Sequence, residues 1–332
     1  MRPDPRLGTF SIVAYDRDRA TWGVAVQSRF VSVGAIVPWA EAGVGALATQ
    51  ARANVGFGPK GLELLRSGAP AEEVLRRLLA ADPLREERQV GIVDRRGRAA
   101  AHTGTACPEF AGHETGDGFS CQGNILFGPE VVPAMARSFE RTPGDLPERL
   151  LAALVAGQRE GGDRRGMQSA ALLLVRADSG YGAVGDRWID LRVDDHPSPI
   201  EELGRIFRIY DLTLLTREDP ASRVPLQGEP LVQLQRDLNV LGFLIGPVPP
   251  RYDERTRAAF RKFLAENNFE NKDRSDGTAW PSVLAYLGQR ARLELARRLT
   301  TQPIVTGALD RGPGGAPPGG GAPSAEKRRP SG

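Results

Sequence analysis

The first two thirds of the chain alternate short apolar runs with helical repeats of apolar residues. The predicted strands, each an apolar run bounded by turn residues, are 10–15, 22–28, 31–38, 44–49, 89–94, 99–103, 120–126, 169–176 and 188–193. The predicted helices, each with apolar residues three or four positions apart, are 59–67, 71–81, 129–140, 145–158 and 200–215. Strand pairs that alternate with helix pairs predict an α+β fold, in which two packed sheets are covered by helices on both sides.

A polar segment separates this region from a smaller helical one. Residues 216–228 contain Pro220 and Pro225 and are predicted to be a linker. Residues 229–300 are predicted to be a small all-α domain, with leucines at helical spacing and Asp253 as a helix N-cap. The expected order is an extension at 1–8, a domain at 9–215, the linker, the helical domain, and a disordered Pro/Gly-rich tail at 301–332.

Composition excludes several classes of partner. The 332 residues include 44 Lys+Arg and 41 Asp+Glu, and a net charge of +3 is too small to indicate nucleic-acid binding. No segment approaches the roughly 18 apolar residues of a membrane helix, and residues 1–6 lack the apolar core of a signal peptide. We therefore expect a cytoplasmic protein with no nucleic-acid or membrane partner.

Residue types that bind metals or cofactors lack the spacing those groups need. Cys107 and Cys121 form no CxxC motif and are expected to be buried free thiols. The three histidines show no metal-ligand spacing. The glycine-rich run at 180–185 fits neither a phosphate loop nor a dinucleotide fingerprint. The sequence predicts no metal and no cofactor.

Thr9 opens the first predicted strand, directly after Gly8. A Thr at the amino end of a chain can be a complete catalytic unit, because its hydroxyl is the nucleophile and its own α-amine, with a pKa of about 7.7–8.0, is the base. This chemistry requires that residues 1–8 are absent from the working protein, through self-cleavage, trimming or a later start. The alternative is an ordinary strand residue, since Thr favours strands.

Neutral hydrogen-bond donors gather near two strand ends. Gln50 and Asn54 lie where a strand passes through small residues into a helix, a turn that can hold an oxyanion. Both residues fit capping or turn hydrogen bonds equally well. Gln122 and Asn124 alternate onto one face of their strand, which suits either two donors aimed at a pocket or hydrogen bonds within the sheet.

A glycine-flanked turn carries Asp163, Arg164 and Arg165. Either arginine is a candidate to bind a substrate carboxylate in a fork, with Asp163 orienting it. The alternative is a surface turn with an internal ion pair.

Several motifs within residues 9–215 resemble domain-of-unknown-function family 1028, a bacterial family with an N-terminal-nucleophile hydrolase-like fold. The matching stretches are Thr9-Phe10-Ser11-Ile12-Val13-Ala14, Gly34-Ala35-Ile36-Val37-Pro38-Trp39-Ala40, Ala48-Thr49-Gln50-Ala51, Gln122-Gly123-Asn124-Ile125-Leu126, the segment 162–171 and Asp194-Asp195-His196-Pro197. The resemblance implies a four-layer αββα sandwich. It does not imply an activity, because the family's function is unassigned.

The broader hydrolase resemblance implies a role for each of four residues. Thr9 would be the nucleophile, Ser28 and Arg29 would tune its amine, and the turn at Gln50 would form the oxyanion hole. A neighbouring cation lowers an amine's pKa and keeps it unprotonated. Proteasome-like enzymes keep a Lys on the third strand, whereas residues 31–37 have none, which departs from their pattern.

The helical domain resembles a peptidoglycan-binding module. The matching stretches are residues 232–238, 241–243 and 252–260, followed by Asp276-Gly277. This resemblance implies a muropeptide or glycan as the partner.

Three functional hypotheses follow. The first is an amide-bond hydrolase in which Thr9 attacks small amide or peptide-like substrates. The second is a non-catalytic protein that binds peptidoglycan fragments through residues 229–290. The third is a structural homo-oligomer of stacked sandwiches.

Overall fold

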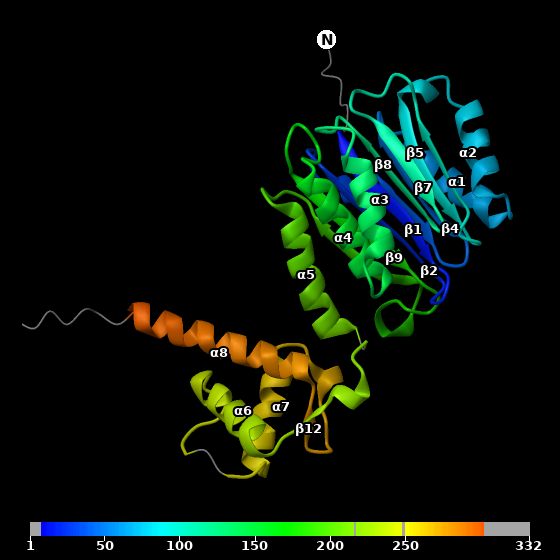
Figure 1. The fold of residues 1–332 in the computed structure, drawn as a ribbon. Helices are drawn as coiled ribbons and strands as arrows, with labels where there is room; N and C mark the ends of the chain where they lie inside the picture. Colours follow the sequence, from blue (N-terminus) through cyan, green and yellow to red (C-terminus); the bar gives the residue numbers. More distant parts are fainter. Residues whose placement is uncertain (1–7, 216, 248–249, 302–332) are drawn as a thin grey trace, which may run out of the picture.

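The computed structural model describes residues 8–215, 217–247 and 250–301. Two antiparallel sheets dominate the part before residue 216, which we call the sheet unit (Figure 1). The first sheet has the order β10 (Arg187–Val193), β9 (Ser169–Val175), β2 (Thr21–Ser28), β1 (Thr9–Asp16), β8 (Phe119–Asn124) and β7 (Gly112–Gly116). The second has the order β3 (Pro38–Glu41), β4 (Gly45–Ala51), β5 (Arg88–Asp94) and β6 (Ala99–Thr103).

Alternation along the strands sends side chains to three separate apolar clusters. Phe10 and Ile12 of β1 face outward, where α3 (Val131–Arg141), α4 (Leu146–Arg159) and α5 (Pro199–Leu214) cover the six-stranded sheet. Val13 faces inward and packs with Val93 of the other sheet. Leu47 faces α1 (Phe57–Arg66) and α2 (Ala71–Ala80) on the outer side of the four-stranded sheet. The chain is thus a mixed α/β protein with helices on the outer faces of two sheets.

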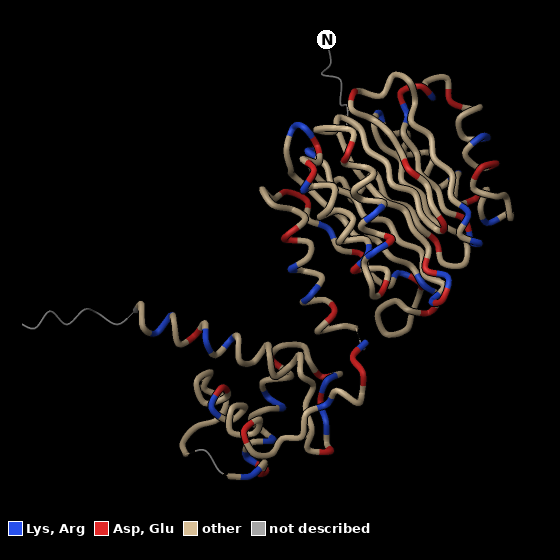
Figure 2. Tube along the Cα trace, in the orientation of Figure 1, with Lys and Arg blue, Asp and Glu red and all other residues tan. Residues whose placement is uncertain are grey.

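Charged residues are concentrated on the helices and loops (Figure 2). The four central strands of the six-stranded sheet, β9, β2, β1 and β8, contain a single charged residue, Asp16, at the end of β1. Uncharged strands that are buried on both faces are expected where helices cover one side and a second sheet covers the other. The sheet is therefore the interior of this unit.

Two details differ from the sequence predictions. Residues 31–38 are not a strand, because Ser32 adopts a left-handed φ of 53° and Val33–Ala35 form a helical turn before β3 begins at Pro38. Val33 and Val37 are apolar because they face the cluster between the sheets. The edge strand β7 was not predicted, since its sequence, GHETG, is polar and has no apolar alternation.

The helical unit, the described residues from 217 onward, has its own core. It contains α6 (Gly228–Val240), α7 (Glu254–Glu266) and α8 (Pro281–Thr301) around Leu234 and Phe263. Asp253 caps α7, as predicted, and accepts a hydrogen bond from Thr256 N at 2.8 Å. The expectation of an all-α unit is corrected by a two-residue strand pair, β11 (Val224–Pro225) with β12 (Thr278–Ala279).

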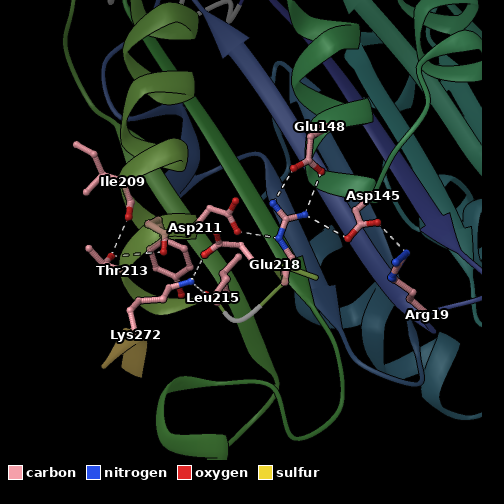
Figure 3. A network of polar contacts seen from close by, with 11 residues as sticks. Arg19, Asp145, Glu148, Ile209, Asp211, Thr213, Leu215, Glu218 and Lys272 are labelled. Atoms are coloured by element: carbon pink, nitrogen blue, oxygen red, sulfur yellow. Dashed lines mark hydrogen bonds and ion pairs between the residues drawn. The ribbon is translucent and has the colours of Figure 1, made fainter. Parts of the chain in front are cut away.

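Ion pairs join the two units at the predicted linker (Figure 3). Arg217 donates to Glu148 at 2.7 Å, to Asp211 at 2.8 Å and to Asp145 at 3.2 Å. The buried Lys272 of the helical unit donates to Glu218 at 2.7 Å and to the carbonyl of Leu215 at 3.3 Å. The segment after α5 is therefore tied to both units, to the sheet unit through Arg217 and to the rest of the helical unit through Glu218. The predicted tail, 302–332, and residues 1–7 of the extension lie outside the described residues.

Within the described ranges, no helix combines the length and apolar character needed to cross a bilayer. Cys107 and Cys121 are free thiols, as predicted. Cys121 is fully buried, whereas Cys107 is only half-buried, contrary to the expectation that both are buried. Burial raises the pKa of the Cys107 thiol to about 11. At neutral pH this thiol is therefore largely protonated and a poor nucleophile.

Candidate functional site

Thr9 is flanked by two polar side chains on neighbouring strands. The register pairs Thr9 with Ser28 of β2 on one side and with Asn124 of β8 on the other. Residues paired directly across antiparallel strands share one face of the sheet. Thr9, Ser28 and Asn124 therefore face the second sheet together, and all three are fully buried.

Hydrogen bonds converge on the peptide bond between Gly8 and Thr9. Thr9 Oγ1 donates to Ser28 Oγ at 3.1 Å, and Ser28 Oγ in turn donates to the carbonyl oxygen of Gly8. Arg165 Nη2 donates to the same carbonyl oxygen at 2.9 Å. A carbonyl held by two donors, one of them cationic, is polarised in the way that an oxyanion hole polarises a reacting carbonyl.

Asp163 fixes Arg165 in this position. Its carboxylate accepts from Arg165 Nη2 at 2.8 Å and from Arg165 Nε at 3.1 Å, and also from the backbone N–H groups of Arg165 and Arg29. The turn that brings the two residues together has Gly162 at a φ of 57° and Gly166 at 106°, which are left-handed conformations that favour glycine. The bidentate ion pair therefore orients the guanidinium toward Gly8.

A buried polar network fills the space between the sheets beside Thr9. Ser11 Oγ donates to Gln50 Oε1 at 2.6 Å and accepts from Gln122 Nε2 at 2.6 Å. Gln50 Nε2 donates to Gln89 Oε1 at 2.8 Å, and Asn124 Nδ2 donates to the same atom at 2.9 Å. Three buried side chains of the six-stranded sheet, Ser11, Gln122 and Asn124, are thereby joined across the gap to Gln50 and Gln89 of the four-stranded sheet.

One polar atom in this network has no partner. Asn124 Oδ1 is buried and makes no hydrogen bond within the part of the chain that the structure describes. An unsatisfied buried acceptor costs about 1–3 kcal/mol. The unpaired acceptor thus belongs to the residue that lies directly across the strands from Thr9.

The other predicted site residues lie elsewhere. Asn54 donates to Asp82 at 2.8 Å and accepts from Gly56 N at 3.1 Å, which is the turn and capping role. The Arg29 guanidinium donates a hydrogen bond to the carbonyl oxygen of Met167 at 2.8 Å, and the Arg29 backbone N–H donates to Asp163. Neither of these hydrogen bonds is made to Thr9. Arg164 has an exposed side chain, and its backbone N–H binds Ile125 O at 2.9 Å.

Gln89 was missed by the sequence interpretation. It lies at the start of β5, is fully buried, and pairs across the strands with Gln50. The sequence signal that could have identified it is a glutamine at the start of one predicted strand, 89–94, and another directly after the end of the preceding one, 44–49. No group of three His, Cys, Asp or Glu side chains that could hold a metal ion is found within the described residues.

The arrangement of the two sheets and the contacts around Thr9 together characterise the class of protein. The sheet unit consists of two facing antiparallel sheets with outer helices, and a strand-opening Thr has its preceding carbonyl held by a hydroxyl and a guanidinium. The model of the family of unknown function DUF1028 matches residues 9–203, and the chain belongs to this family.

Two further likenesses extend this result. A crystal structure of a DUF1028 protein from Silicibacter pomeroyi is similar with a TM-score of 0.56 and 30% sequence identity, covering 62% of this chain and 89% of that one. A family model of a peptidoglycan binding domain matches residues 213–287. Among proteins with curated descriptions, none matches the chain.

Proposed function

We propose that the sheet unit is an amide-bond hydrolase of N-terminal-nucleophile type, with Thr9 as the nucleophile. We further propose that its layers correspond to the four-layer αββα sandwich of that class. The observation that carries the proposal is the convergence of Ser28 and Arg165 on the carbonyl oxygen of Gly8, next to the Thr9 hydroxyl. The same arrangement supports release of the Thr9 amine by self-cleavage.

In the first step Thr9 Oγ1 attacks the Gly8 carbonyl carbon. Its proton passes to Ser28 while the Ser28 proton passes to the Gly8 oxygen, along the two observed hydrogen bonds. The bond between Gly8 and the Thr9 nitrogen then breaks, and the nitrogen takes up the proton of the intermediate. Gly8 is left as an ester on Thr9, and water hydrolyses this ester to release the Gly8 carboxylate and to free the Thr9 amine and hydroxyl.

The mature site then acts on a separate substrate. The freed Thr9 amine takes the proton of its own hydroxyl as the hydroxyl attacks a substrate amide. Arg165 and Ser28 stabilise the carbonyl oxygen of the acyl group that replaces Gly8. The role of the cation beside the Thr9 amine, which the sequence assigned to Arg29, passes to Arg165. Its guanidinium is the cation that contacts the Gly8–Thr9 peptide. The substrate class is a small amide or peptide-like molecule.

The test is the amino-terminal sequence and intact mass of the purified full chain. Wild-type protein is expected to begin at Thr9, and Thr9→Ser is expected to do the same because it keeps a hydroxyl. Thr9→Ala is expected to retain residues 1–8. A wild-type chain that still begins at Met1 or Arg2 after prolonged incubation removes Thr9 as a self-activated nucleophile. Cleavage of Thr9→Ala at the same bond would instead show an external protease.

A second function is favoured by the match of residues 213–287 to a peptidoglycan binding domain. We infer that the helical unit binds peptidoglycan fragments, with a muropeptide as the ligand. This function is independent of Thr9, since it remains if the amine is never released.

A further inference from the structure

A groove of about 790 Å³ lies between α5 of the sheet unit and α8 of the helical unit. Its lining includes four arginines, Arg205, Arg208, Arg290 and Arg292, and no carboxylate. Figure 2 shows basic positions recurring along both helices. The volume lies within the range of about 300–1,000 Å³ typical of small-ligand sites.

Most of this positive charge is not neutralised by the protein. Arg205 is paired with Glu202 at 2.6 Å. Arg208 and Arg292 make no hydrogen bond or ion pair within the described residues, although the charge of Arg292 acts on the more distant Asp237. In the described parts of the chain, Arg290 makes one hydrogen bond, from its Nη1 to the Tyr286 hydroxyl at 3.3 Å. Three guanidinium groups are therefore available to one ligand.

Apolar side chains border the same groove. Ile209 and Leu293 line it with 43% and 61% of their surface exposed, and Tyr286 contributes an aromatic ring. Guanidinium forks bind carboxylates in a bidentate fashion, while the apolar residues suit short aliphatic side chains. This combination fits a short peptide with several carboxylates better than a neutral sugar chain.

We propose that this groove is the ligand site of the helical unit and that it binds the carboxylates of the stem peptide of a peptidoglycan fragment. The proposal rests on the second function above and specifies which part of the ligand is recognised. Arg208 belongs to the sheet unit and Arg290 and Arg292 to the helical unit, so both units form the site. In Figure 1, β1, the strand that Thr9 opens, begins near the end of the sheet unit marked N, and the helical unit lies at the other end. The two proposals are therefore tested separately.

The experiment is calorimetric titration of the full chain with a muramyl pentapeptide. Wild type is expected to bind it, and to bind the same peptide with amidated carboxylates at least tenfold more weakly. The double variant Arg208→Gln, Arg292→Gln is expected to lose at least tenfold in affinity, and thermal unfolding checks that it is folded. The matched control is Arg236→Gln, an exposed arginine of α6 outside the groove, which is expected to bind like wild type.

Each contrary result has a distinct meaning. If the double variant binds as tightly as wild type, the groove is the wrong site although the binding function stands. If wild type binds neither peptide, both the groove and the binding function fall. Equal binding of a peptide-free chito-oligosaccharide overturns stem-peptide recognition, and so does tighter binding of inorganic phosphate or of an oligonucleotide.

Discussion

Two buried aspartates of the sheet unit are each paired with an arginine, and the two pairs are used differently. Asp82 binds Arg88 Nε at 2.8 Å, and the Arg88 side chain is only 9% exposed. Asp163 binds Arg165 Nη2 at the same distance, but the Arg165 side chain is 34% exposed. The same kind of ion pair therefore has a buried arginine in the first case and a partly exposed arginine in the second.

The remaining donors of each arginine explain this contrast. The Nη1 atom of Arg88 donates to the carbonyl oxygen of Arg52, and its Nη2 atom donates to Asp82 a second time. These hydrogen bonds of Arg88 therefore serve the packing of the interior. Arg165 directs a donor to Gly8, the residue before the proposed nucleophile. A buried pair stabilises the chain only while both members are present. We infer that the first pair holds together the loops after β4 and before β5, and that the second holds the carbonyl of Gly8, which we propose reacts with Thr9.

Removal of Asp82 is expected to have the largest effect on stability. Asp82→Ala leaves the Arg88 charge buried without a counter-ion and also removes the acceptors of Asn54 and Leu84 N. We expect a loss of about 3–5 kcal/mol in the free energy of unfolding. Urea unfolding monitored by circular dichroism measures it.

A double variant provides the control for this prediction. Asp82→Leu combined with Arg88→Met replaces the pair by apolar groups, which is often neutral or stabilising. It should recover much of the stability lost by Asp82→Ala. A single variant that unfolds like wild type would contradict the structural role assigned to this pair.

Replacement of Arg165 is expected to affect chemistry more than stability. Arg165→Gln removes a charged donor to the Gly8 carbonyl, and loss of one such donor costs about 10²–10³ in rate. The rate of appearance of chains beginning at Thr9, followed by mass spectrometry, measures this loss. Because the Arg165 side chain is partly exposed, we expect its ion pair to contribute only about 1 kcal/mol to stability.

Arg164→Gln is the matched control, since Arg164 is the exposed neighbour on the same turn. It should cleave at the wild-type rate. Equal slowing in the two variants would mean that the charge of the turn matters and the contact with Gly8 does not.

The sequence predicted the sheets better than it predicted the connections. The strands from 10 to 28 and from 89 to 103 follow from apolar runs around polar turns. The strand predicted at residues 31–38 is wrong. Val33 and Val37 are buried, but a helical turn rather than a strand buries them, and an apolar sequence alone does not distinguish the two. The polar edge strand β7 lacks any periodic pattern, and only its pairing with β8 defines it.

Residues of the candidate site were predictable where strand alternation determines direction. The sequence places Gln122 and Asn124 on one face of their strand, and in the structure they lie with Thr9 on the face toward the second sheet. Thr9 and Gln122 alternate there with Phe10 and Cys121, which face the outer helices. The distinction between Arg29, Arg164 and Arg165 was not predictable, because three arginines in loops carry the same sequence pattern. Arg165 is distinguished by the contact of its guanidinium with the Gly8 carbonyl, which its ion pair with Asp163 orients.

The smallest expected effect is the loss of stability at acidic pH that comes from protonation of Asp82. Burial raises the pKa of Asp82, but hydrogen bonds from Arg88, Asn54 and Leu84 N outweigh it and hold the pKa at about 2. This value lies below the unfolded one of about 3.9, so Asp82 contributes stability above about pH 4 and loses it as pH falls toward 2. Asp82→Asn should therefore be less stable than wild type at pH 7 and should lose less on acidification. Urea unfolding at pH 7, 4 and 3 tests this, and parallel losses in the two proteins would show that the acid sensitivity arises from other carboxylates.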